Sequence, residues 1–277
     1  MNDPNIVSVD QQPIVEEFEP ALRPARGYSI TVDNLRKNYG KTVAVDGISF
    51  SVYEQETFGI LGPNGAGKTT TMEILEGMRR ADSGHAIVAG VDVSKHPRRV
   101  KQLIGVQLQS SAYLANLNLG ELLVLFGALY GRHVDPDALL ARVGLTEKAK
   151  SVFFKMSGGQ KQRFSIAAAL VNSPRILFLD EPTTGLDPQA RRNLWELVQD
   201  IRAEGRTVVL TTHYMEEAET LCDRVAIMDR GRIIALDRPQ VLVQNLLDRG
   251  FRRERVEREA NLEDVFIDLT GRALREG

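Results

Sequence analysis

Cysteine and long apolar runs are both scarce in this sequence, and each scarcity excludes a class of protein. Cys222 is the only cysteine among 277 residues, which rules out a disulfide framework and fits a reducing compartment. The most apolar stretch, residues 117–130, is interrupted by Asn118, Gly120 and Glu121, so it is too short and too polar to span a bilayer. The first residues are acidic and contain no apolar run, and no signal peptide is predicted. We expect a soluble protein that reaches a membrane only through a partner.

A strong charge imbalance is also missing. Lysine and arginine number 35 against 37 aspartates and glutamates, a net charge of −2, so no basic field argues for nucleic acid. No histidine or cysteine group has metal-ligand spacing, and we interpret His85, His96 and His133 as ordinary surface residues. What the chain does have is a hydrophobic share of 43%, which is ordinary for a globular protein with a buried core. Its length fits one large α/β domain with an insert, or two small domains.

One glycine-rich stretch organises the rest of the chain. It fits the phosphate-binding loop pattern, since an apolar run at residues 58–61 precedes it and a helix is predicted from about residue 68 to 76. Glycine lacks Cβ, so its backbone can take positive φ and approach a ligand. Consecutive N–H groups and the helix N-terminus then form a cradle for phosphate oxygens. The stretch predicts nucleotide binding and consists of Gly62, Pro63, Asn64, Gly65, Ala66, Gly67, Lys68, Thr69 and Thr70.

Two further strand ends carry polar residues. Residues 176–179 form a continuous apolar run, typical of a parallel strand covered on both faces, and end in Asp180 and Glu181. Adjacent carboxylates at a buried strand end would repel each other, and bound magnesium with a water to be activated is their natural balance. The apolar run at residues 207–212 ends at His213. Open α/β sheets place their ligands at the carboxyl ends of strands, so both ends are candidate site positions.

Two helix starts follow a similar logic. The small residues at 156–160 precede a predicted helix and would form a second anion site, although such a turn is more often a plain helix start. Asp187 and Pro188 predict another start, with aspartate as the N-cap and proline at the first helical position. Gly205 is expected to end that helix.

Composition separates an N-terminal tail from a folded domain. Residues 1–26 hold four prolines among acidic residues and predict a flexible tail. A domain over residues 27–235 follows. It opens with alternating runs at 29–32 and 48–52, which predict half-buried antiparallel strands with Tyr39 presented by the turn between them.

The second half of the chain adds an insert and an extension. Apolar positions from about 110 to 164 have helical spacing and predict an inserted helical subdomain. The strands expected at 225–228 and 232–235 close the domain, and residues 236–277 are expected to form a C-terminal helical extension. Its mixed-sign run at 249–259 predicts a solvated helix or linker, with contact to acidic lipid or to a partner as the alternative.

Together these pieces resemble the ATP-binding cassette (ABC) ATPases over residues from about 28 to 235. One motif would be suggestive, but six in the order of the family are highly specific. The resemblance implies an α/β fold, with a P-loop NTPase core (a RecA-like parallel sheet), an antiparallel β subdomain and an inserted helical subdomain. The signature departs mildly, with Met156 where leucine is usual. The motifs are the phosphate loop, a glutamine loop at Gln109, the signature at 156–160, the acidic strand end at Asp180 and Glu181, the loop at 185–187 and the switch His213.

The resemblance also assigns roles around one nucleotide. ATP and Mg²⁺ are the implied cofactors. Tyr39 would stack on adenine and residues 62–70 would hold the phosphates, with Lys68 meeting the β- and γ-phosphates. Thr69, Gln109 and Asp180 would hold the magnesium ion directly or through water.

Two of the remaining residues would act on the attacking water and on the γ-phosphate. Glu181 would be the general base that polarises the water, and His213 would contact the γ-phosphate. Gln109, at the junction with the helical insert, would sense closure of the site and pass it to a membrane partner.

The resemblance further implies two partners. Cassettes of this family pair head to tail, so Ser157, Gly158, Gly159 and Gln160 would serve the nucleotide of a second ATPase subunit, which is either an identical copy or a paralogue. Asp187 would cross the same interface. The other partner is a transmembrane permease subunit, which places the chain at the cytoplasmic face of the membrane. No nucleic acid partner is expected.

The tail at residues 262–272 resembles the daunorubicin-resistance type of bacterial ABC exporter ATPase, with part of that type's C-terminal region shortened here. It implies export of a drug, lipid or polysaccharide-like substrate through a separate subunit. An ABC importer ATPase and a non-transport ABC ATPase are the alternatives. Translation-type members resemble two fused cassettes and repair-type members carry a long coiled coil, and neither feature fits this chain. A metabolic P-loop kinase would not need the signature at 156–160.

Overall fold

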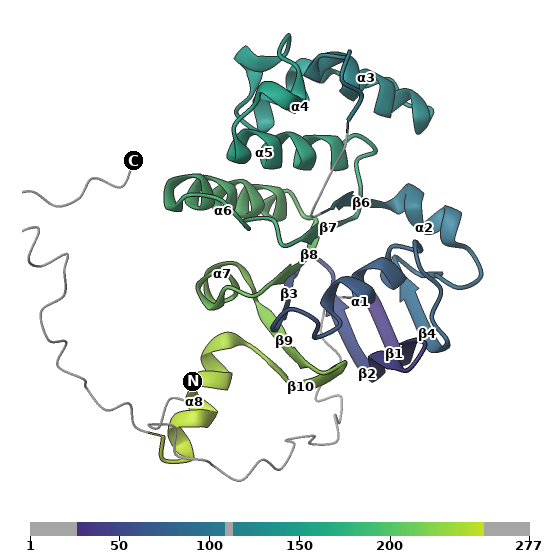
Figure 1. The fold of residues 1–277 in the computed structure, drawn as a ribbon, viewed down its shortest axis with the longest axis vertical. Helices are drawn as coiled ribbons and strands as arrows, with labels where there is room; N and C mark the ends of the chain where they lie inside the picture. Colours follow the sequence, from purple (N-terminus) through teal and green to yellow (C-terminus); the bar gives the residue numbers. More distant parts are fainter. Residues whose placement is uncertain (1–26, 109–112, 252–277) are drawn as a thin grey trace, which may run out of the picture. The chain divides into compact units, whose positions relative to one another are not determined.

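The computed structural model of the protein describes residues 27–108 and 113–251 (Figure 1). By its internal contacts the chain divides after Leu242 into two units. The first unit contains both β-sheets and the helices α1 to α7. The second begins within α8, Pro239–Asp248. Gln109, the predicted tail at 1–26 and the pattern at 262–272 lie outside the described residues.

One sheet is antiparallel and has the order β2-β1-β4-β5. Its two long strands, β1 (Tyr28–Tyr39) and β2 (Thr42–Tyr53), extend well beyond the predicted runs at 29–32 and 48–52. Register shifts such as the one between Val32 and Leu35 interrupt the alternation of apolar and polar residues, so the sequence pattern shows only parts of each strand. The shorter strands are β4 (Ser83–Val88) and β5 (Val91–Asp92).

The second sheet has six strands in the order β10-β9-β3-β8-β7-β6. The strands from β9 to β6 are parallel to one another, and β10 pairs antiparallel to β9 at one edge. The bounds are β3 Thr57–Leu61, β6 Ile104–Gln107, β7 Ile176–Asp180, β8 Thr207–Thr212, β9 Arg224–Asp229 and β10 Arg232–Asp237.

The parallel sheet is buried on both faces, as the continuous apolar runs predict. Leu177 and Leu179 of β7 belong to one hydrophobic core, together with residues of α5 (Gly158–Ala169) and α6 (Pro188–Ala203). Ile176 and Phe178 belong to the other core, with residues of α1 (Lys68–Leu75) and of the antiparallel sheet. Each fully buried side chain of this size contributes roughly 1.5–3 kcal/mol. The sheet is therefore a rigid platform for its strand ends.

The insert between β6 and β7 contains α3 (Leu119–Leu129), α4 (Pro136–Arg142) and α5. Asn118 and Glu121 form a capping box at the start of α3. Asp135 is the N-cap of α4, and Pro136 is its first helical residue. The predicted helical pattern is interrupted between α4 and α5, where the chain forms two short 3₁₀ turns, Thr146–Lys148 and Phe153–Lys155.

The sequence patterns did not predict two short helices, α2 (Pro97–Leu103) and α7 (Met215–Leu221). Each is only seven residues long, so its apolar spacing gives little signal. The predicted start of α6 is confirmed, because Asp187 accepts a hydrogen bond from the Ala190 N–H and Pro188 is the first helical residue. Among the described residues, no helix has the length and apolar character needed to cross a bilayer.

Candidate nucleotide site

The carboxyl ends of three neighbouring parallel strands meet at one edge of the sheet. The strand register sets Leu61, the last residue of β3, beside Thr212 of β8. It also sets Asp180, the last residue of β7, beside Thr211. The phosphate loop, the acidic pair and His213 therefore leave the sheet side by side, as predicted from the strand ends.

Close backbone approaches explain two glycines of the phosphate loop. A Cβ on Gly62 would lie 2.1 Å from the carbonyl oxygen of Met228, in β9. Gly67 has φ +104°, and a Cβ there would lie 2.2 Å from the carbonyl oxygen of Ala44, in β2. Neither position accepts a side chain, because backbone atoms cannot move aside as a flexible side chain can. The loop is thus held between the two sheets, immediately before α1.

Lys68, the first residue of α1, points back into the loop and is only 4% exposed. Its Nζ donates to the carbonyl oxygens of Gly62 at 2.8 Å and Pro63 at 3.2 Å. The same Nζ lies 3.2 Å from Oε1 of Glu181. The lysine charge is therefore positioned next to the predicted phosphate cradle and is compensated there by a carboxylate.

Asp180 joins the loop to β8 through two hydroxyl groups. Thr211 Oγ1 donates to Asp180 Oδ1 at 2.5 Å and accepts from the Glu181 N–H at 2.9 Å. Thr69 Oγ1 lies 3.3 Å from Asp180 Oδ2. Burial raises the pKa of Asp180, and the charge of Glu181 adds to that effect against the hydrogen bond from Thr211. Carboxylate and hydroxyl oxygens facing each other in a buried, negatively charged place fit the hard oxygen ligands that Mg²⁺ prefers.

Glu181 has a backbone conformation that is unusual for a residue with a side chain, with φ +46°. Its Oε2 accepts from the Thr184 hydroxyl at 3.2 Å. Burial raises the pKa of Glu181, but the hydrogen bonds and charges of Lys68 and His213 outweigh burial, so the net direction is downward. The carboxyl group is therefore ionised at neutral pH, which is the state a general base needs.

His213 follows β8 and is partly exposed, with 32% of its side chain accessible. Its Nδ1 lies 3.4 Å from Oε2 of Glu181. Its ring lies 4.1 Å, centroid to centroid, from the ring of Tyr214.

Tyr39 is the last residue of β1 and is 42% exposed. The Arg79 guanidinium lies 5.1 Å and the Lys37 ammonium 5.8 Å from the ring centroid. Both cations are themselves paired, Arg79 with Glu73 and Lys37 with Asp82. The ring is thus an exposed aromatic surface beside two cationic groups, each of which is balanced by a carboxylate.

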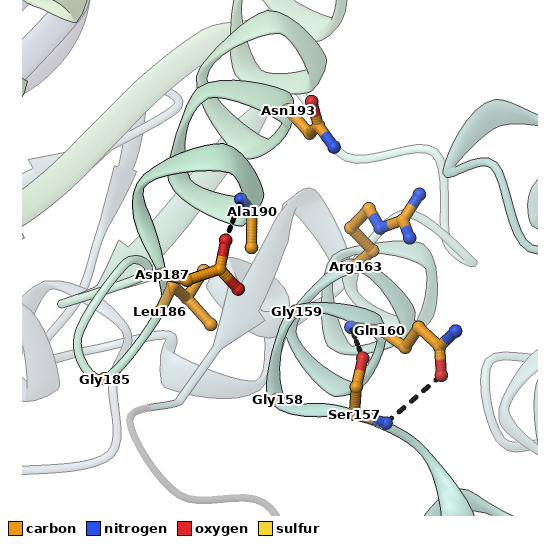
Figure 2. A pocket seen from close by; sticks show the side chains of 10 residues that line it. All are labelled: Ser157, Gly158, Gly159, Gln160, Arg163, Gly185, Leu186, Asp187, Ala190 and Asn193. Carbon is orange, nitrogen blue, oxygen red and sulfur yellow. Dashed lines mark hydrogen bonds between the residues drawn. The ribbon is translucent and has the colours of Figure 1, made fainter. Parts of the chain in front are cut away.

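The signature residues form a different group from the phosphate loop (Figure 2). Ser157 is the N-cap of α5, where Gln160 N–H and Ser157 Oγ are 3.4 Å apart and the Ser157 N–H donates to Gln160 Oε1 at 3.1 Å. Asp187 faces this capping box across a pocket of about 190 Å³. Neither the phosphate loop nor Glu181 lines the pocket, whose residues are Ser157, Gly158, Gly159, Gln160, Arg163, Gly185, Leu186, Asp187, Ala190 and Asn193.

The sequence did not predict a role for two residues near the site, Thr211 and Gln107. Thr211 lies within an apolar strand, and only its hydroxyl signals a polar role. Gln107 ends β6, is 1% exposed, and its Nε2 lies 3.3 Å from Gln162 Oε1 of α5. The predicted role of Gln109 stays a prediction. Within the described parts of the chain no three histidine, cysteine, aspartate or glutamate side chains cluster as a metal site, so an ion at Asp180 would take its other ligands from hydroxyl, water or phosphate oxygens.

This arrangement defines a P-loop nucleotide-binding ATPase. It consists of a strand, a glycine-rich loop, a lysine at the start of a helix, and two carboxylates where a neighbouring parallel strand ends. The family model described as ABC transporter matches residues 45–184. The chain belongs to this family, whose ATPase domains bind and hydrolyse ATP, and the prediction made from the six motifs is confirmed.

Three similar proteins place the chain more closely. It is 44% identical over 212 residues to the linearmycin resistance ATP-binding protein LnrL of Bacillus subtilis, covering 75% of this chain and 68% of that protein. It is 43% identical over 221 residues to the daunorubicin resistance ATP-binding protein DrrA2 of Streptomyces coeruleorubidus, covering 78% and 69%. Among solved structures, cbiO1 from Clostridium perfringens, part of the ABC transporter complex cbiONQ, superimposes with a TM-score of 0.71 at 29% identity, covering 80% and 94%.

Proposed function

We propose that this chain is the ATP-hydrolysing subunit of an exporter and powers transport through a separate transmembrane subunit. The observation that carries the proposal is the contact of Lys68 and His213 with Glu181, directly beside Asp180. Hydrolysis of ATP needs a cation for the phosphates, an anchor for a metal and a base for water in one place. Export is supported by the resistance proteins to which the chain is similar.

In the proposed reaction a water oxygen attacks the γ-phosphorus, the bond to the bridging oxygen breaks, and ADP and phosphate leave. Glu181 accepts the proton of the water, while Lys68 and the loop amides balance charge on the phosphate oxygens. Asp180 and Thr69 would hold Mg²⁺, which neutralises phosphate charge when bound. Because Lys68 is paired with Oε1 of Glu181 at 3.2 Å, phosphates that draw Lys68 away would remove this contact and let water approach Oε1.

Tyr39 is the proposed adenine contact. Its exposed ring presents a flat apolar surface, and stacking on an aromatic face is a common way to hold a base. Gln109 is the proposed sensor that also reaches the metal. Gln107, two residues before it, is hydrogen-bonded to Gln162 of α5, the helix that begins within the signature.

The signature pocket supports a second ATPase subunit. Ser157 and Asp187 share a pocket that the chain's own phosphate loop does not line, so these residues fit a nucleotide held by another copy or a paralogue. Each bound ATP would then link two chains, and ligand would drive their association by mass action.

The helical insert is the proposed contact for the transmembrane subunit at the cytoplasmic face of the membrane. It carries exposed apolar side chains, with Val124 50%, Leu129 74%, Tyr130 45% and Phe154 53% accessible. These exposed apolar side chains support an interface at the insert.

The test uses Glu181→Gln, which keeps the size and hydrogen-bonding ability of the side chain but not its basicity. We expect ATP to bind while hydrolysis falls by about 10²–10⁴-fold, the usual contribution of a general base. Light scattering with ATP and magnesium should show a dimer that is absent without ATP. Adding Ser157→Arg to the same chain should abolish the dimer and leave nucleotide binding intact. Normal hydrolysis by Glu181→Gln would refute the site, and a double variant that still pairs would refute the interface.

A further inference from the structure

Glu217, on α7 and four residues after His213, is fully buried, with 0% of its surface exposed. The proposed chemistry does not use this carboxyl group. Burying a carboxylate is costly unless it is paired or hydrogen-bonded, so the groups around it indicate what it stabilises.

Those groups come from three different segments. Trp195 of α6 donates from Nε1 to Glu217 Oε1 at 3.2 Å. Two hydroxyls lie close enough to the same carboxyl group to lower its pKa. They belong to Thr212, at the end of β8, and Thr183, in the loop after β7. Burial raises the pKa of Glu217, and the hydroxyls of Thr212 and Thr183, the Trp195 N–H and the charge of Arg191 lower it in part.

Each segment also carries a residue of the proposed site. Thr183 lies two residues after Glu181, and the adjacent Thr184 hydroxyl donates to Glu181 Oε2 at 3.2 Å. Thr212 directly precedes His213 and accepts from the Tyr214 N–H at 2.9 Å. The carboxyl group of Glu217 is therefore the point at which these segments meet below the surface.

A second contact joins α6 to the segment after His213, in addition to the hydrogen bond between Trp195 and Glu217. The guanidinium carbon of Arg191, in the first turn of α6, lies 4.6 Å from the ring centroid of Tyr214, the residue after His213. Arg191 therefore connects α6 to the His213 segment while its charge faces Glu217. Both contacts tie the helix capped by Asp187 to the segment that follows β8, through Glu217 and Tyr214.

The contact between Glu217 and the loop that contains Glu181 is incomplete. Glu217 Oε2 and Thr183 Oγ1 are both buried, and neither makes a regular hydrogen bond within the described residues. A small shift of the loop that contains Glu181 would let these two atoms pair. Buried polar atoms gain most from pairing, so this contact favours one position of the loop.

We propose that Glu217 is a positioning residue for ATP hydrolysis, which holds the Glu181 loop and the His213 strand end in one arrangement through Thr183, Thr212 and Trp195. This inference rests on the roles proposed above for Glu181 and His213. A base that is misplaced by about 1 Å can lose about 100-fold in rate, so a residue that touches neither ATP nor water can still set kcat.

The experiment compares Glu217→Leu, which removes the hydrogen bonds at similar volume, with Glu217→Gln, which preserves them. We expect Glu217→Leu to lower kcat by about 10- to 100-fold. The Kd for ATP should change far less than kcat, because Glu217 reaches the phosphate loop only indirectly, through Thr212, whose carbonyl oxygen accepts from the Gly62 N–H at 3.3 Å. Glu217→Gln should restore most of kcat, since the amide oxygen accepts from Trp195 and the threonine hydroxyls can rotate to match the amide.

The matched control is Glu56→Leu. Glu56 is also buried, at 4% exposed, and pairs with Arg224 at 2.7 Å, but it precedes β3 at the opposite end from the phosphate loop. This variant should lower Tm yet leave kcat within about twofold, because distant sites act independently. The imidazole NMR signal of His213, assigned with a His213→Ala protein, should shift in Glu217→Leu and stay in place in Glu56→Leu.

Three results would overturn the inference: an unchanged kcat in Glu217→Leu, an equal loss of kcat in Glu56→Leu, or a weakening of ATP binding in proportion to the loss of rate. Glu181→Gln is measured beside them. If it still hydrolyses ATP, the proposed function fails; if it is inactive while Glu217→Leu is fully active, only the role of Glu217 fails.

Discussion

Replacing Glu76 by glutamine should stabilise the protein at neutral pH. Glu76 is the C-cap of α1 and is 1% exposed. Burial raises its pKa from 4.5 to about 8, the charges of Asp180 and Glu73 add to that effect, and Lys101 opposes it. The folded protein therefore keeps this carboxyl group protonated at pH 7. Glutamine has the shape of the protonated acid and does not titrate.

The sign and size follow from linkage. Between pH 4.5 and pH 8 the folded state binds one proton more at Glu76 than the unfolded state, so the free energy of unfolding falls as pH rises. The loss accumulates at about 1.4 kcal/mol per pH unit above the unfolded pKa, so that Glu76 costs about 3 kcal/mol at pH 7. Glu76→Gln should remove this cost at pH 7 and change little near pH 4.5.

The assay is urea unfolding of both proteins at pH 5, 6, 7 and 8, followed by circular dichroism. The stability difference should grow steadily with pH. Glu73→Gln is the control, because Glu73 lies on the same helix but is 30% exposed and paired with Arg79. Its effect should be small, since exposed ion pairs contribute about 0–1 kcal/mol. A difference for Glu76→Gln that does not vary with pH, or a loss of stability at pH 7, would refute the reasoning.

Two further variants test the nucleotide site. Lys68→Ala should raise the Kd for ATP by about 10- to 100-fold, as loss of a hydrogen bond to a charged group implies, and near-normal binding in calorimetry would contradict the placement of the phosphates. Thr211→Val should lower the free energy of unfolding by about 1–3 kcal/mol, because it leaves the buried Glu181 N–H without its acceptor. Unchanged urea midpoints for Thr211→Val would show that this bond is replaced by another.

The sequence predicted those parts of the site whose chemistry is local. The phosphate loop is a contiguous pattern, and its context of strand before and helix after is visible within about 20 residues. The N-cap at Asp187 is equally local, because its partner Ala190 lies three positions away. Asp180, Glu181 and His213 were found because each follows an apolar run, and the position after a buried strand is informative without knowledge of the sheet order.

Long-range neighbours could not be predicted in this way. The strand order sets β3 between β8 and β9, which are far from it in the chain, and no spacing in the sequence states that order. The full lengths of β1 and β2 were also hidden, because register shifts break the alternation on which the sequence pattern depends.

The sequence by itself therefore determined the family, the pattern of the candidate phosphate loop and the polar strand ends, because each rests on residues close together in the chain. Only the tertiary structure decided which groups face one another: Lys68 with Glu181, Thr211 with Asp180, and Glu217 with Trp195. The physical reason is that packing brings these side chains together from separate strands and helices. Hydrogen bonding, burial and shifted pKa values arise only once they are in contact.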